Sequence, residues 1–388
     1  MKVLHVIPSV SPRRGGPSTV IRSLTQGLSL RGHEVHVATT DDDGPQHRTG
    51  ATGSHNENGV TYHYFRRNAI PYTLSVSFFR WLWKHASDYD LLHIHAVFSF
   101  PSDVAAAIAY IQSVPYIIRP LGILGQWGLR HNRPFLKRML YYAYLRTLLS
   151  HASTMHYTSG QERREAESMG FKATAVVLPN PVDIPPPHDG VQELFRLSFP
   201  DIGARPYLLF LSRIDRKKGL DLLIPAFAAV RKSFPDLALV IAGEGTPAYI
   251  TELKAIVDSH NLRNDIFWVG FVSGDRKTSA YVDSELFVLS SYSENFGVAP
   301  VEAMALGTPI VISDAVGIHE DITLCSAGIV VEQNIDSIAR GITLVLSTPA
   351  LRRQLTGNAV AMIHTHYSLE AVCSKLEHLY RSLCASPV

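Results

Sequence analysis

Apolar, β-branched and aromatic residues recur in short runs along the chain, and segments long enough for a helix separate many of these runs. Runs such as KVLHVI (2–7), EVHVATT (34–40) and LLHIHA (91–96) are typical of buried strands. The alternation stops at PNPVDIPPPHDG (179–190), where proline is too frequent for a helix or a central strand. It resumes at RPYLLFLSRI (205–214). Strands that alternate with helices predict parallel sheets, so we expect an α/β protein with two sheets joined by a proline-rich connection.

The length of 388 residues also indicates two domains, because one hydrophobic core rarely grows beyond about 250 to 300 residues. We expect an N-terminal Rossmann-like αβα domain over residues 1–183 and a C-terminal one over residues 184–365. In the remaining segment, 366–388, apolar residues recur at helical spacing within SLEAVCSKLEHLYRSL (368–383). This spacing predicts a terminal amphipathic helix.

The composition is that of a water-soluble globular protein, with 46% hydrophobic and 18% charged residues. No run approaches the roughly 20 apolar residues that span a bilayer, and the N-terminal run is too short for a signal peptide. The three cysteines, Cys325, Cys373 and Cys384, are far apart, which favours a reduced, cytoplasmic setting. The 18 histidines show no ligand spacing in the sequence, so we expect neither a metal nor another cofactor.

The net charge of +2 is unevenly distributed, because residues 1–185 carry 19 Lys and Arg against 12 Asp and Glu. Between Asp103 and Glu162 the sequence contains basic residues but no acidic ones. Within this interval, the 130–150 region combines Arg and Lys with Phe, Leu and Tyr. One interpretation is an ordinary helix with a solvated basic edge; the other is a peripheral contact with the inner face of a membrane. Nucleic acid is not expected as a partner, since no recognition motif accompanies the charge.

Two motifs place glycine or cations just after a predicted strand. Gly15 and Gly16 precede a proline and a helix, where backbone N–H groups can approach a phosphate. A plain turn is the alternative, and the spacing differs from the G-x-G-x-x-G of a dinucleotide site. In the second half, Arg213 follows a strand and Lys218 precedes a helix. A planar guanidinium and a compact ammonium at one junction could hold a diphosphate, although surface loop residues remain the alternative.

The stretch SENFGVAPVEAMALGTPIV (293–311) carries two carboxylates in an apolar setting. Glu294 lies in the loop before a predicted helix, and Glu302 lies inside that helix. A buried carboxylate needs hydrogen-bond donors, and a carboxylate accepts two hydrogen bonds from a vicinal diol. The positive helix end favours a phosphate nearby. The stretch therefore predicts a site for a sugar and a phosphate, with both carboxylates satisfied by ligand hydroxyls.

Taken together, these motifs resemble the retaining glycosyltransferases of family 4, which have the GT-B fold. RGHEVHV (31–37), DYDLLHIHAVF (88–98) and AGEG (242–245) support the resemblance, which covers essentially the whole chain. It implies two Rossmann-like domains that face each other across a central cleft, with the terminal helix crossing back to the first domain. It also implies a donor site made of Gly15, Gly16, Arg213, Lys218, Phe271, Glu294, Asn295, Phe296, Gly297, Val298 and Glu302.

The family resemblance implies transfer of a hexosyl group from a nucleoside diphosphate sugar to a hydroxyl acceptor, with retention of configuration and without a metal. We favour a UDP-sugar as donor, with GDP-mannose as the alternative, and a lipid-linked saccharide of polysaccharide biosynthesis as acceptor. A soluble small acceptor, a phosphorylase or epimerase of the same fold, and a nucleotide-sugar binding protein without turnover are the other interpretations. We assign catalytic roles to Glu294, Arg213, Lys218 and His95.

The sequence departs from the family pattern at two places in its first half. Pro181 stands where the family commonly has glycine in P-N-G-V-D. The region where some members carry a histidine near the sugar reads IIRPLGILGQW, so Arg119 cannot take that role. His95 is the candidate instead, with a buried structural histidine as the alternative.

Overall fold

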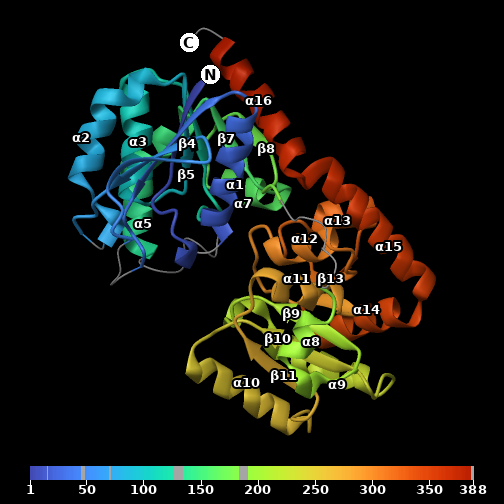
Figure 1. Cartoon of the computed structure of the whole chain (residues 1–388). Helices are drawn as coiled ribbons and strands as arrows, with labels where there is room; N and C mark the ends of the chain where they lie inside the picture. The colour runs from blue at the N-terminus through green and yellow to red at the C-terminus, as the bar shows by residue number, and fades with distance from the viewer. Residues whose placement is uncertain (15, 45–48, 70, 126–133, 183–190, 386–388) are drawn as a thin grey trace. The chain divides into compact units, whose positions relative to one another are not determined.

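The computed structural model describes residues 1–14, 16–44, 49–69, 71–125, 134–182 and 191–385. The chain forms two compact units, which we call unit 1 (residues 1–181 and 367–388) and unit 2 (residues 182–366) (Figure 1). The boundaries expected from the sequence, 183/184 and 365/366, lie within two residues of these limits. Most of the proline-rich connection, residues 183–190, lies outside the described residues.

Unit 1 is built on a sheet with the strand order β3-β4-β2-β1-β5-β6-β7-β8. Neighbouring strands run parallel, except that β3 pairs antiparallel with β4. β3 was not predicted from the sequence, because its residues, GSHNE, are polar and mostly exposed. The strands are β1 (Lys2–Val6), β2 (Glu34–Thr40), β3 (Gly53–Glu57), β4 (Val60–Phe65), β5 (Leu91–His95), β6 (Tyr116–Arg119), β7 (Thr154–Tyr157) and β8 (Ala175–Val177).

Helices cover both faces of this sheet and enclose one apolar cluster on each side. On one side α1 packs closely against the terminal helix α16: a side chain at Gly27 would lie 2.7 Å from the Cys373 sulfur. Within the 130–150 region, the described residues from 134 onward form α5, a π-helical turn and α6. The helices are α1 (Gly16–Leu30), α2 (Val76–His85), α3 (Phe100–Ile111), α5 (Pro134–Leu140), η4 (Tyr141–Leu145), α6 (Arg146–Ser150), α7 (Gly160–Glu167) and α16 (Leu369–Ala385).

Unit 2 contains a parallel sheet with the order β11-β10-β9-β12-β13-β14. The four inner strands are nearly wholly buried runs such as YLLFL and ALVIA, as expected for a sheet covered on both faces, and the edge strands β11 and β14 are partly buried. The α-helices and strands are α8 (Leu194–Ser198), β9 (Tyr207–Leu211), α9 (Leu220–Arg231), β10 (Ala238–Ala242), α10 (Pro247–Ser259), β11 (Ile266–Gly270), α11 (Gly274–Val282), β12 (Leu286–Leu289), α12 (Val298–Ala305), β13 (Ile310–Ser313), α13 (His319–Cys325), β14 (Ile329–Val331), α14 (Ile335–Ser347) and α15 (Pro349–Met362).

The strand order of each sheet reverses at one position, which fixes where a ligand can bind. In unit 1 the first strand, β1, lies between β2 and β5; in unit 2 the first strand, β9, lies between β10 and β12. Open parallel sheets bind ligands beyond the carboxyl ends of the strands at such a switch point. The α/β class with two parallel sheets is thus confirmed, and each sheet offers one such position. Among the described helices, none has the length and apolarity required to cross a bilayer.

Candidate functional site

In unit 2, the loops after β9 and β12 meet at the switch point. The backbone N–H of Tyr292 donates to the carbonyl of Lys217 at 2.7 Å, and the Ser290 hydroxyl donates to the carbonyl of Gly219 at 2.8 Å. Gly219 has a φ of +70°, and a Cβ there would lie 2.0 Å from the Ser290 carbonyl oxygen. Only glycine fits at this close contact between the two loops. The two loops that carry the predicted cations and carboxylates are therefore held against each other.

Lys218 is the buried cation of this junction. Its residue is 6% exposed, and its ammonium contacts the carboxylate of Glu294. Burial, followed by the charges of Lys217 and Arg213, lowers the pKa of Lys218 to about 7. The adjacent Glu294 carboxylate favours the charged ammonium and opposes this shift. Arg213 is exposed at the start of the loop after β9. Arg213, Lys217 and Lys218 concentrate positive charge in one short segment, and this charge favours an anionic ligand.

The backbone of the loop before α12 is fixed on both sides of Glu294. Its N–H donates to the Ala315 carbonyl at 3.0 Å, and its carbonyl accepts from the N–H of Gly317 at 2.8 Å. Gly297 has a φ of +93°, and a Cβ there would lie 2.8 Å from the Val316 side chain. Because the loop is fixed, α12 starts at a defined place, with Val298 as its first residue. The N–H groups of a first helical turn lack intrahelical partners and attract anions.

The other two predicted residues of this loop differ in exposure. Phe296 is 3% exposed and belongs to the buried side of the loop, whereas Asn295 is half-buried. The sequence predicted that backbone groups from Asn295 to Val298 bind a ligand. In unit 2 this backbone lies between the Lys218–Glu294 pair and the start of α12.

Glu302 has two protein partners from α11. One of its carboxylate oxygens accepts from the Lys277 ammonium at 2.8 Å, and the other accepts from the Tyr281 hydroxyl at 2.9 Å. The expectation that ligand hydroxyls satisfy both carboxylates therefore needs correction: protein groups already offset the burial of Glu294 and Glu302. A carboxylate has about four acceptor positions, so both residues retain capacity for a ligand. The sequence analysis missed Lys277 and Tyr281, since no local pattern links them to a residue more than 20 positions away.

Phe271 follows β11 at the same edge of the sheet and is 72% exposed. Nearby, Gly243 has a φ of +143°, and its N–H donates to the Gly270 carbonyl at 2.7 Å. A Cβ at Gly243 would lie 1.9 Å from the Ser212 carbonyl oxygen. The AGEG segment therefore brings the ends of β9, β10 and β11 into close contact. Arg213 and Phe271 lie at this edge, on neighbouring loops.

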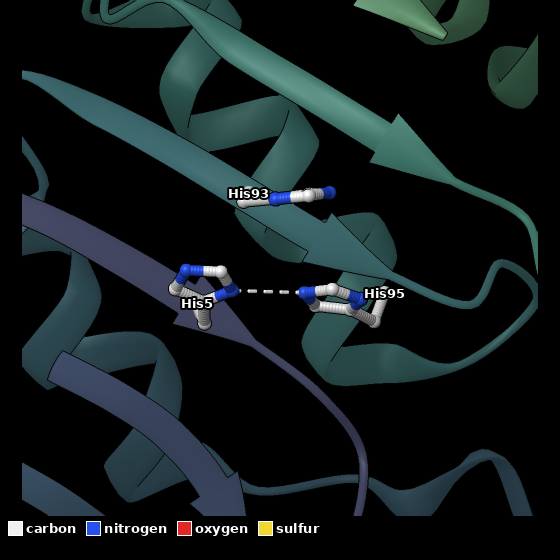
Figure 2. Close-up of side chains that lie close together, drawn as sticks. All are labelled: His5, His93 and His95. Carbon is white, nitrogen blue, oxygen red and sulfur yellow. Dashed lines mark hydrogen bonds between the residues drawn. The ribbon is translucent and has the colours of Figure 1, made fainter. Parts of the chain in front are cut away.

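In unit 1, the predicted residues fall at the other switch point. Gly15 lies outside the described residues, while Gly16 is the first residue of α1. His95 ends β5 and is 1% exposed; its Nε2 lies 3.0 Å from Nδ1 of His5 on β1. Figure 2 shows these two rings facing each other, with His93 beside them on β5. His95 thus occupies the buried, hydrogen-bonded position that the structural alternative described.

His95 belongs to a buried cluster that contains four imidazoles and one guanidinium. The members are His5, His93, His95, His156 and Arg119. His93 contacts the Tyr380 hydroxyl through Nδ1 at 2.6 Å and His156 through Nε2 at 3.2 Å. Burial, with the charge of Arg119 as a second cause, lowers the pKa of His5 to about 3. The same effects lower the pKa of His156 to about 3. Arg119 is 2% exposed and donates to the Asn180 side chain, so it ties β6 to the end of unit 1.

The structure brings three of these histidines into a constellation that the sequence did not reveal. His5, His93 and His95 each offer a ring nitrogen, and these atoms lie within 4.8 Å of one another. Imidazole nitrogens are common zinc ligands. However, Arg119 places a positive charge close enough to lower the pKa of both His93 and His95. That charge would also repel a divalent cation, so the cluster is better suited to metal-free neutral imidazoles that hydrogen-bond to one another than to a metal ion.

Comparison with known proteins gives two family matches, one for each unit. The family described as glycosyl transferases group 1 matches residues 195–362, and the family described as glycosyl transferase 4-like domain matches residues 15–181. An uncharacterized glycosyltransferase of Methanocaldococcus jannaschii is 27% identical over 98% of both chains. The alpha-D-kanosaminyltransferase of Streptomyces kanamyceticus is 32% identical over 46% of both chains. A phosphatidyl-myo-inositol mannosyltransferase of Mycobacterium tuberculosis is 28% identical over 58% of both chains.

Two solved structures share the fold over nearly the whole chain. The sucrose-phosphate synthase from Thermosynechococcus elongatus superposes with a TM-score of 0.77 at 19% identity and covers 100% of both chains. Anabaena HepE in complex with UDP and glucose gives a TM-score of 0.76 at 19% identity and covers 98% of this chain and 100% of its own. At this identity, the likeness concerns the fold.

Proposed function

The chain belongs to the group 1 glycosyl transferases and has the GT-B fold, and on this premise we propose that it transfers a hexosyl group from a nucleoside diphosphate sugar to a hydroxyl acceptor with retention of configuration. The observation that carries this proposal is the contact between Lys218 and Glu294 beside the start of α12. A cation, a carboxylate and free helix N–H groups within one short region are suited to a phosphate that carries a sugar.

In this proposal, Arg213 and Lys218 hold the donor diphosphate, together with the first N–H groups of α12. The bond between the anomeric carbon and the diphosphate oxygen breaks, and negative charge grows on the leaving group. Fixed cations and helix dipoles stabilise that charge where it develops. The acceptor oxygen bonds to the same face of the anomeric carbon, and the leaving phosphate takes the acceptor proton. Since Arg213 and Lys218 supply positive charge, the reaction proceeds without a divalent metal ion.

Glu294 is proposed to bind hydroxyls of the transferred sugar, and Glu302 to bind the ribose of the nucleotide. Both carboxylates have acceptor capacity beyond their protein partners. Phe271, at the same edge of the unit 2 sheet, is the remaining donor residue predicted in this unit. We favour UDP as the nucleotide, supported by the UDP that accompanies glucose in the Anabaena structure. GDP-mannose is the alternative donor, supported by the mannosyltransferases among the relatives.

For the acceptor, we propose a lipid-linked saccharide of polysaccharide biosynthesis, reached at the membrane surface. The helical segment from α5 to η4 exposes Phe135 by 83%, Met139 by 51% and Tyr142 by 63%. The basic residues Lys137 and Arg138 lie on the same segment. Exposed aromatic and basic groups together favour anionic lipid. Residues 130–133 of the predicted basic region lie outside the described residues.

The membrane contact is tested by sedimentation with vesicles of phosphatidylglycerol and of phosphatidylcholine. We expect the chain to sediment with the anionic vesicles only, and a Phe135→Ser/Tyr142→Ser variant to lose this binding. Equal recovery in the supernatant with both lipids would instead favour a soluble small-molecule acceptor.

The donor site is tested by thermal stabilisation with UDP, GDP, ADP and NAD. We expect one nucleoside diphosphate to raise the melting temperature, and Arg213→Ala and Glu302→Ala to abolish the shift. Arg216→Ala is the matched control, because Arg216 lies in the same segment but pairs with Glu252 at the surface. The absence of a shift with every nucleoside diphosphate would refute the proposed donor site. Binding without sugar transfer to any acceptor would leave a non-catalytic nucleotide-sugar binding protein.

A further inference from the structure

Unit 1 contains a cavity whose lining residues belong neither to the proposed donor site nor to the histidine cluster. It has a volume of about 490 Å³ and lies between α3, the segment of η4 and α6, and the turn η2 (Pro71–Thr73). Most of its wall is apolar and comes from residues such as Val104, Ala107 and Leu148. Its polar groups are the side chains of Tyr72, Asp103, Tyr144 and Thr147. An apolar cavity with a few convergent polar groups is the usual form of a small-ligand site.

The polar groups of this cavity converge on one carboxylate. The hydroxyls of Tyr72 and Tyr144 both donate to the same oxygen of Asp103, in the case of Tyr144 at 2.8 Å. The other oxygen accepts from the backbone N–H of Phe98 at 3.2 Å. Asp103 is 5% exposed, and burial raises its pKa to about 6 despite these hydrogen bonds. At neutral pH the carboxylate is therefore ionised in an apolar environment.

Within the described residues, no Lys, Arg or His forms an ion pair with Asp103. Hydrogen bonds from neutral groups and the start of α3, where Asp103 lies in the first turn, stabilise the carboxylate only partly. Buried charges in proteins are normally paired, because an uncompensated one is costly. The cavity thus contains a negative charge for which the described residues supply no ion-pair partner.

The backbone around this carboxylate is also strained. Tyr72 and Thr73 have φ values of 67° and 54°, and Phe98 has a φ of 57°. A bulky or β-branched residue in this left-handed region costs about 1 to 3 kcal/mol, and such costs concentrate at ligand sites. If Asp103 only stabilised the fold, its hydrogen bonds would be explained, but the cavity beside it would not be needed.

We propose that this cavity binds the ammonium group of an amphiphilic organic amine, with Asp103 as its counter-ion. The rings of Tyr72 and Tyr144 attract the cation, and the apolar wall accommodates the hydrocarbon part of the ligand. A neutral alcohol would add a third hydroxyl donor to Asp103 but no compensating charge. A plain hydrocarbon chain would remove water from the carboxylate and leave it unpaired. The amine is therefore the ligand class that improves every contact in the cavity.

If the proposed function holds, the cavity also indicates the chemical class of the acceptor; this extension of the inference rests on the proposed function. The turn η2 follows β4 and α3 follows β5, so Tyr72 and Asp103 both lie beyond carboxyl ends of strands, where ligands of parallel sheets bind. The acceptor would then carry an amine in addition to the hydroxyl that receives the sugar.

The test uses the full chain and the probe hexylammonium, with 1-hexanol as the uncharged counterpart, both titrated by calorimetry at pH 7.5. We expect saturable binding of hexylammonium that is at least tenfold tighter than that of 1-hexanol. Asp103→Asn should weaken hexylammonium binding at least tenfold, and the matched variant of an exposed acid, Asp88→Asn, should leave it unchanged. Equal affinity for both probes, no binding of hexylammonium, or unchanged binding by Asp103→Asn would overturn the inference.

A second variant keeps the test decisive if Asp103→Asn fails to fold. Ala107→Leu fills the cavity from its apolar wall without touching the carboxylate, and it should also abolish hexylammonium binding. If the Ala107→Leu variant still binds hexylammonium, this cavity is not the binding site. Titration of UDP on the same samples separates the two hypotheses. If the unaltered chain binds UDP but not hexylammonium, only the cavity is refuted; if it binds hexylammonium but no nucleoside diphosphate, only the proposed donor site is refuted.

Discussion

Acidification from pH 7 to pH 5 should destabilise unit 1 more than unit 2. The cause is the buried cluster of His5, His93, His95 and His156, whose pKa values burial lowers below 6.5. In the unfolded chain these imidazoles bind protons near pH 6.5, whereas in the folded chain they stay neutral to a much lower pH. The unfolded state therefore binds more protons in this interval, so the stability falls as the pH falls.

The magnitude follows from the histidines whose folded pKa is about 3. At pH 5, the unfolded pKa of 6.5 lies 1.5 pH units above the solution pH, so His5 and His156 each contribute a loss of about 2 kcal/mol. Asp103 acts in the opposite direction, because its pKa is raised to about 6 and the folded chain binds its proton first. This offsets about 1 kcal/mol. We expect a net loss of at least about 3 kcal/mol, a large share of the stability of a domain, because the lowered pKa values of His93 and His95 act in the same direction.

The assay is equilibrium unfolding in urea at pH 7 and pH 5, followed by a pulse of deuterium labelling and mass spectrometry. Peptides from β1 and β5 report on unit 1, and peptides from β9 and β12 report on unit 2. With a urea dependence of about 2 kcal/mol per molar, the midpoint of unit 1 should fall by about 1.5 M relative to that of unit 2. Unit 2 is the internal control, since its described histidines are exposed or half-buried.

The variant His5→Asn should remove about 2 kcal/mol of this pH dependence, whatever its effect at pH 7. His260→Asn, at an exposed position of unit 2, is the matched control. Equal shifts of both midpoints between pH 7 and pH 5, or a pH dependence that His5→Asn leaves intact, would show that the cluster is not the source and would refute the reasoning.

Three further outcomes are expected from unit 2. Gly219→Ala should destabilise unit 2 by at least about 1 to 3 kcal/mol in urea unfolding, because the new Cβ would lie 2.0 Å from the Ser290 carbonyl oxygen at a φ of +70°. The control Gly357→Ala, in α15 with open space around it, should be neutral or stabilising. Equal effects of the two variants would contradict this account. Glu302→Gln should weaken UDP binding about tenfold in calorimetry, since a charged hydrogen-bond acceptor is lost, and unchanged affinity would remove Glu302 from the proposed ribose site. Sugar transfer should persist in EDTA, because Arg213 and Lys218 supply the positive charge; loss of turnover that magnesium restores would refute metal independence.

Local sequence patterns were sufficient to locate most strands and the loops that carry the residues of the proposed donor site. A buried parallel strand is a short apolar run, and the loop after it carries the chemistry, so Arg213, Lys218 and Glu294 could be placed at strand ends without coordinates. The polar strand β3 could not be found in this way, although Asn58-Gly59, with φ values of 51° and 81°, is the turn dipeptide of a hairpin. Its residues lack the apolar alternation that marks a strand.

The partners of the site residues, in contrast, depended on the tertiary structure. Glu302 meets Lys277 across 25 positions of sequence, Tyr72 meets Asp103 across 31, and His5 meets His95 across 90. Each contact exists because the strand order sets distant loops or strands side by side, and hydrophobic periodicity carries no information on that order. The sequence by itself therefore determined which residues could carry charge and where strands end. The packing of the sheets decided which of those charges are buried, which are paired, and which, such as Asp103, have no ion-pair partner among the described residues.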